Sequence, residues 1–252
     1  MAEFDRQGYA RPTSIPGADA YAIDQGLRAY MLRVYNYMAA GVAITGVVAY
    51  VTYMMAVVQT SAGPQLTGFG NMIFNSPLKW VVMLAPLGMV FFLSARINKM
   101  SVSAAQTTFW AFAALMGLSL ASIFMVYAGG SIARVFFISA AAFGGLSLYG
   151  YTTKKDLSGW GSFLIMGLIG IIIASIVNIF LASSAMQFAI SVIGVLVFAG
   201  LTAYDTQQIK EMYYVGDGEA TMGKKAIMGA LRLYLDFINL FLMLLSLFGN
   251  RE

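Results

Sequence analysis

The sequence contains neither cysteine nor histidine, and charged residues are scarce. Without cysteine the chain has no disulfide, no thiolate nucleophile and no cysteine metal ligand. Without histidine, catalysis by imidazole, haem ligation by imidazole and the common zinc sites are excluded. Only 10% of the 252 residues are charged, whereas soluble domains have roughly 25%. Proton chemistry near neutral pH must therefore depend on carboxylates or lysines in unusual surroundings.

Apolar residues dominate what is present. They make up 60% of the chain, including 17 methionines and 18 phenylalanines, which is more than one soluble core can bury. The composition therefore predicts an integral membrane protein whose first partner is the lipid bilayer. The net charge of +4 is modest and unevenly distributed along the chain, which indicates membrane orientation and not nucleic-acid binding.

Seven apolar runs are long enough to cross a bilayer, which needs roughly 20 mostly apolar residues. Short connections join them and leave no room for a soluble domain. The predicted fold class is an all-α integral membrane protein, with a seven-helix transmembrane domain over residues 34–252. The runs cover about residues 34–58, 78–95, 102–128, 133–151, 160–182, 186–205 and 230–248.

The residues before the first run are polar and lack the short apolar core and cleavage site of a signal peptide. We expect residues 1–18 to be a disordered cytoplasmic tail. In residues 19–33, apolar side chains recur at helical spacing with Arg28 and Arg33 between them. That pattern is typical of an interfacial helix on an anionic leaflet. A plain cytoplasmic extension of the first span explains it equally well.

The distribution of basic residues predicts the orientation. With the N-terminus in the cytoplasm, eleven of the 15 lysines and arginines face the cytoplasm and three face outward, while Arg232 lies inside the last run. Because cytoplasmic loops of membrane proteins are enriched in basic residues, this asymmetry predicts a cytoplasmic N-terminus and an external C-terminus.

Three ionisable residues lie in or near the last two runs. Asp205 falls at the end of the sixth run, and Arg232 and Asp236 fall at the front of the seventh. An ionised side chain near the centre of a span costs roughly 2.5–3.5 kcal/mol on insertion scales, so each needs a partner, water or a bound proton. Because the two runs form neighbouring antiparallel helices, the carboxylates are expected side by side.

Two adjacent, poorly hydrated carboxylates are expected to hold one proton between them and to titrate as a coupled pair. Asp205 is placed near a negative helix C-terminus and Asp236 near a positive helix N-terminus, so the hypothesis puts the shared proton mainly on Asp205. The structural alternative is that Asp205 marks the water boundary and Asp236 pairs with Arg232. Intramembrane ionisable residues are functional often enough to keep both interpretations.

The segments LVFAGLTAYDTQQIK and LRLYLDFINLFLMLL resemble the paired C-terminal signature of the transmembrane Bax inhibitor motif (Bax inhibitor-1/YccA-like) family, in its bacterial branch. The resemblance implies that the protein lies in the inner, or plasma, membrane of a bacterium and that the seventh helix lies at the centre of the bundle. It also implies that Asp205 and Asp236 form a proton-sharing pair that gates a pH-sensitive calcium leak. An arginine of the second helix would latch the pair, and Arg96 is the best match.

Calcium would then be the transported ion, with Asp205 and Asp236 as its ligands at the gate, because this hard cation prefers oxygen. Arg232 is the second candidate for the latch. The calcium-leaking relatives carry an acidic residue in the second helix. Its position falls near Gly88 in this chain. The chain is expected to be a monomer without a cofactor.

Other function classes weigh less. Another bacterial branch of the family modulates a membrane-bound protease, so the alternative is a non-channel protein with a membrane partner. A retinal photoreceptor needs a Schiff-base lysine in the last helix, and 231–248 contains none. The sequence has no motif for a metal site, a phosphate site or a catalytic nucleophile, so an enzyme is poorly supported.

Overall fold

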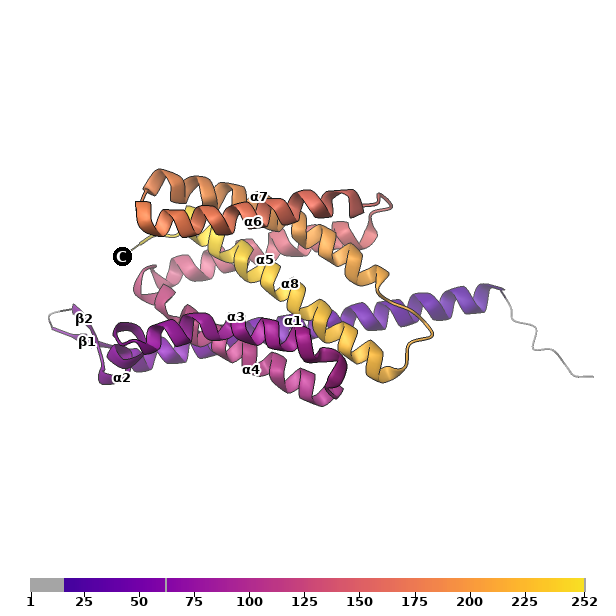
Figure 1. Cartoon of the computed structure of the whole chain (residues 1–252), viewed down its shortest axis with the longest axis horizontal. Helices are drawn as coiled ribbons and strands as arrows, with labels where there is room; N and C mark the ends of the chain where they lie inside the picture. The colour runs from indigo at the N-terminus through magenta and orange to yellow at the C-terminus, as the bar shows by residue number, and fades with distance from the viewer. Residues whose placement is uncertain (1–15, 62, 252) are drawn as a thin grey trace, which may run out of the picture.

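The computed structural model describes residues 16–61 and 63–251, so the first fifteen residues of the predicted tail lie outside it. The described chain is a bundle of long helices with one small hairpin (Figure 1). Its elements are α1 (Pro16–Ala56), β1 (Val57–Thr60), β2 (Gly63–Leu66), α2 (Gly68–Gly70), η1 (Asn71–Asn75), α3 (Leu78–Arg96), η2 (Ile97–Lys99), α4 (Val102–Leu120), η3 (Ala121–Met125), α5 (Gly129–Thr152), α6 (Ser158–Leu181), α7 (Ser184–Glu211) and α8 (Glu219–Phe248).

The predicted fold class is confirmed. In the described part of the chain, seven helices are long and apolar enough to cross a membrane, and each contains one of the seven predicted runs or most of it. Long helices are the expected solution, because a bilayer offers no water to satisfy exposed backbone groups and a helix satisfies them internally.

The first helix runs without interruption from Pro16 to Ala56. Residues 16–18 therefore belong to α1 and not to the predicted tail. Residues 19–33 are helical, as the spacing predicted, but no break separates them from the first span. The segment and the first span thus form one continuous helix.

The C-terminal helix lies at the centre of the bundle, as the resemblance implied. In Figure 1, α8 crosses the bundle diagonally between a group formed by α1, α3 and α4 and a group formed by α5, α6 and α7. It packs against α7, α1, α5 and α4. Fully buried side chains line its whole length, among them Ile227, Leu233, Tyr234 and Leu240.

The outer helices present apolar side chains to their surroundings. On α6, the side chains of Ile179 and Phe180 are 76% and 84% exposed. A similar apolar surface covers α3, where Phe91 and Val81 are exposed. Contiguous apolar surface of this kind is unfavourable in water and favourable against lipid tails, so these faces are the ones that contact the bilayer.

A short β-hairpin follows α1 and was not expected from the sequence. Strands β1 and β2 pair antiparallel, with Val57 opposite Leu66 and Thr60 opposite Gly63. Gly63 has a φ of 106°, a conformation that is easy only for glycine, so it closes the turn. The hairpin lies at the same end of the bundle as the C-terminus (Figure 1), opposite the connection between α7 and α8.

Candidate functional site

Asp205 and Asp236 meet at the interface between α7 and α8. Their carboxyl groups lie close enough that the charge state of each acts on the other. Asp236 is buried, with 5% of its surface exposed, and its Oδ2 has no hydrogen-bond partner among the described residues. Asp205 is half-buried. The structure therefore brings together the two carboxyl groups that the sequence placed on neighbouring helices.

The position of Asp236 along its helix corrects the sequence-based placement. Helix α8 begins at Glu219, so Asp236 lies about 26 Å from the start and not in the first turns. Asp205 lies about 9 Å before the end of α7. Because the effect of a helix dipole fades within the terminal turn, neither dipole end reaches the pair. The reason for placing the shared proton on Asp205 is thereby removed.

The early start of α8 has a packing explanation. Its first turns carry Lys224 and Lys225, so these turns do not belong to an apolar run. On their other face, however, Gly223, Ala226 and Ile227 are buried. Lys225 donates a hydrogen bond to the Met212 carbonyl at 2.9 Å, which fixes the amphipathic segment to the end of α7.

The two candidate latch residues lie in different places. Arg232 is one turn before Asp236, has an exposed side chain, and its charge acts on both carboxyl groups. Arg96 ends α3, which packs against α4, and its side chain is exposed. Among the described residues neither arginine forms an ion pair with Asp205 or Asp236; the ion pairs there are Arg33–Glu219 and Lys225–Asp217.

The TAYDTQQIK segment fixes the end of α7 in several directions. Gln207 is buried, donates to the Lys155 carbonyl at 2.8 Å and accepts from the Leu157 amide at 2.8 Å. Lys210 Nζ donates to the Tyr151 carbonyl at 2.8 Å. The connection between α5 and α6 is thus tied to the same turns that carry Asp205. This anchoring explains why polar side chains end the sixth apolar run.

A chain of hydroxyl groups links three helices beside the pair. Tyr35 of α1 contacts Ser147 of α5 at 2.8 Å, and Ser147 contacts Thr206 of α7 at 2.9 Å. Thr206 donates to the Thr202 carbonyl at 2.7 Å. Because each hydroxyl has one proton, Tyr35 must donate to Ser147 and Ser147 to Thr206. Sequence reasoning missed this chain, since its members are isolated hydroxyl residues on three separate helices.

Helix α8 is also tied to the first helix near Asp236. The Tyr234 hydroxyl lies 2.6 Å from Thr45 Oγ1, and Thr45 Oγ1 donates to the Ala113 carbonyl of α4 at 2.8 Å. The Tyr234 and Thr45 side chains and the Ala113 carbonyl make these contacts in the buried interior. The segment that carries Asp236 is consequently held against α1 and α4 as well as α7.

Comparison with known proteins agrees with this architecture. The family model described as inhibitor of apoptosis-promoting Bax1 matches residues 27–252. The inner membrane protein YbhL of Escherichia coli K12 is 48% identical over 90% of this chain and 94% of its own length. A protein of Caulobacter vibrioides is 47% identical over the full length of both chains. Protein RP147 of Rickettsia prowazekii is 47% identical over 91% of this chain and 92% of its own.

The family match includes α8 and both aspartates of the pair, and it covers all but the first 26 residues. The relatives are matched over nearly their whole lengths, so the likeness is not confined to one segment. Together with the seven spanning helices, these matches establish that the chain is a multi-pass membrane protein of the Bax inhibitor-1 family.

Proposed function

We propose that this protein is a pH-sensitive cation leak channel, with calcium as the favoured ion, gated by Asp205 and Asp236. The observation that carries the proposal is the meeting of two carboxyl groups inside a lipid-facing bundle, one of them buried. A hydrogen bond between two carboxyl groups requires a proton on one of them, because ionised carboxylates only accept. The pair is therefore suited to bind and release protons.

Gating follows from the charge of the pair. When protonated, the two groups hydrogen-bond to each other and hold α7 against α8. When they lose protons, two negative charges repel each other at close range and attract a cation. Arg232, the charged residue whose field reaches both carboxyl groups, opposes that repulsion. Cation flux should consequently be low at acidic pH and rise as the pH increases.

The ligand set favours passage over tight binding. Calcium in stable sites takes six to eight oxygen ligands. Within the described residues, no group of three or more acidic side chains could hold a metal ion. A cation at the pair would have two carboxyl groups and would keep water for its remaining positions, so it could leave again.

The decisive experiment is flux into liposomes that contain only this protein. Calcium, potassium and sodium uptake would be measured from pH 5 to pH 8 with empty liposomes as the control. We expect calcium uptake that increases with pH. Absence of flux for every ion and pH would reject the channel. Copurification of a membrane-bound protease would then favour the alternative function, modulation of such a partner.

The proposed setting is the inner membrane of a bacterium, as in the name of the Escherichia coli relative. The proposed orientation has the N-terminus in the cytoplasm and the C-terminus outside, on the basis of the basic-residue asymmetry. The Asp205–Asp236 interface then lies closer to the cytoplasmic end of α7, and calcium entering the cell would meet it late in its path.

A further inference from the structure

An open groove lies between α1 and α5. It has a volume of about 730 Å³, within the range of roughly 300–1,000 Å³ that is typical of ligand pockets. Helix α1 packs against α4 and α8, whereas α5 packs against α7 and α8, so the groove separates two helices with different main partners. Its lining includes the apolar side chains of Met31, Leu32, Met38, Phe143 and Leu148.

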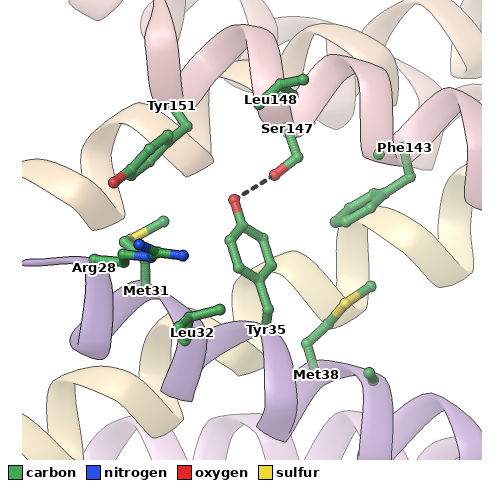
Figure 2. A pocket seen from close by; sticks show the side chains of 11 residues that line it. Arg28, Met31, Leu32, Tyr35, Met38, Phe143, Ser147, Leu148 and Tyr151 are labelled. Carbon is green, nitrogen blue, oxygen red and sulfur yellow. Dashed lines mark hydrogen bonds between the residues drawn. The ribbon is translucent and has the colours of Figure 1, made fainter.

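The charged side chain that lines the groove lies at one end of it. Arg28 and Tyr151 lie at that end (Figure 2), which is the N-terminal end of the part of α1 that lines the groove. Among the described residues Arg28 forms no ion pair, so its charge is available to a ligand. Arginine presents a planar fork of donors that matches the oxygens of a phosphate.

The groove has the length of one lipid leaflet. Its lining on α1 extends from Arg28 to Ala39, which is about 16 Å along the helix. Half of a hydrocarbon core of about 30 Å is about 15 Å. An acyl chain in the apolar part would therefore place the phosphate of the same lipid at the level of Arg28.

The groove is held in a fixed shape. Figure 2 shows the Tyr35 ring reaching from α1 toward Ser147 on α5, where the two hydroxyl groups are 2.8 Å apart. Thr206 continues that hydrogen-bonded chain into α7. Because this hydrogen bond joins two protein side chains, it forms without a ligand. A ligand can then enter without rearranging the lining residues, which lowers the free-energy cost of binding.

We propose that this groove binds one anionic phospholipid from the cytoplasmic leaflet, with the acyl chain between α1 and α5 and the phosphate on Arg28. The occupant is a lipid and not a second protein, because the groove combines leaflet length, an apolar lining and, at the interfacial end, one cation that forms no ion pair with the described residues. This site does not depend on ion conduction, so it can be tested separately from the channel.

The chain offers a matched pair of glycines for the test. A side chain added at Gly144, which lines the groove, or at its neighbour Gly145, which does not, would meet no atom within 4 Å of its Cβ. Gly144→Leu should fill the groove, while Gly145→Leu adds the same group to the helix outside it. Ala39→Leu fills the groove from α1 and covers the case in which Gly144→Leu fails to fold.

The measurement is native mass spectrometry of the full chain released from nanodiscs of equal parts phosphatidylglycerol and phosphatidylcholine. We expect the wild type and Gly145→Leu to retain one phosphatidylglycerol, and Gly144→Leu and Ala39→Leu to lose it. Arg28→Gln should lower the preference for phosphatidylglycerol about tenfold, the ratio that one charge-assisted contact supports. Lys99→Gln, an exposed basic residue outside the groove, should not.

Four results would overturn the proposal. Retained lipid in both groove-filling variants would show that the lipid binds elsewhere. An unchanged headgroup preference in Arg28→Gln would remove the phosphate contact. Displacement of the lipid by inorganic phosphate alone, or a dimer that groove filling dissociates, would assign the surface to a free anion or to a second copy of the chain.

Discussion

At the residue scale, the Asp205–Asp236 pair concentrates the chemistry of the molecule. Asp236 is buried and Asp205 half-buried, and the two carboxyl groups face each other across the α7–α8 interface. Burial weakens the screening of charge, so the protonation of one group depends strongly on the other. The two side chains should therefore behave as one titrating unit.

The pair should show its coupling in substitution experiments. Asp205→Asn and Asp236→Asn each keep the side-chain shape but remove the repulsion, so each should flatten or shift the pH dependence of ion flux. The double variant should resemble either single variant, with a coupling energy of about 0.5–3 kcal/mol. Liposome flux over pH, together with thermal unfolding of each variant, measures this.

A different pattern would contradict the pair. If Asp205→Asn retained the wild-type pH response while Asp236→Asn unfolded at a lower temperature, Asp236 would be a structural partner of Arg232 and not a gate.

Arg232 is expected to influence the pair more than Arg96 in the conformation described here, because its charge acts on both carboxyl groups. A nearby positive charge favours ionised carboxylates, so Arg232→Gln should move the flux midpoint to higher pH, by up to roughly one unit. Arg96→Gln should have a smaller effect. Flux titrations of the two variants in the same lipid decide between them.

The opposite order would support the latch inferred from the family resemblance. A larger effect of Arg96→Gln would mean that α3 moves and carries Arg96 from its exposed position to the carboxyl pair.

At the scale of elements, the contact between α5 and α7 depends on a missing side chain. A Cβ at Gly150 would lie 2.2 Å from the Ala203 carbonyl oxygen, which is backbone and cannot rotate away. Gly150 allows the two helices to approach closely, as small residues do in membrane bundles. This contact positions the α7 segment that carries Asp205.

Gly150→Ala should therefore destabilise the protein by about 1–3 kcal/mol, the cost of overpacking. Gly145→Ala on the same helix is the control, because its Cβ would enter open space. Thermal unfolding in one detergent should show a lower midpoint for Gly150→Ala alone. Equal midpoints would mean that α5 and α7 separate without cost.

At the scale of the whole molecule, the two ends of the bundle differ in charge and in structure. The β-hairpin and the C-terminus occupy one end, and the α7–α8 connection occupies the other (Figure 1). The cytoplasmic side assigned by basic residues is the end with the α7–α8 connection. The Asp205–Asp236 pair and the Arg28 end of the groove lie toward that end. So do the hydrogen bonds that Gln207 and Lys210 make with the end of α5 and the α5–α6 connection.

The natural absence of cysteine makes this orientation testable with single labels. Ser61→Cys in the hairpin should react with a membrane-impermeant maleimide in intact spheroplasts, because the hairpin is expected outside. Ala220→Cys at the start of α8 should react only after permeabilisation. The reversed labelling pattern would invert the predicted topology.

The sequence alone determined the class of the protein and the number of spans. Long apolar runs are local properties of the chain, and lipid leaves the backbone little choice except a helix. The clustering of Asp205, Arg232 and Asp236 in the last two runs was equally visible. Helix ends were less accurate, because α8 begins with an amphipathic segment whose lysines hide it from a hydropathy pattern.

Only the tertiary structure decided which side chains meet. It brought Asp205 to Asp236, placed both within reach of the Arg232 charge, and joined Tyr35 to Ser147 and Thr206. It also opened the groove between α1 and α5. These features depend on which helix faces are adjacent and at what tilt, and hydropathy along one helix carries no information about its neighbour.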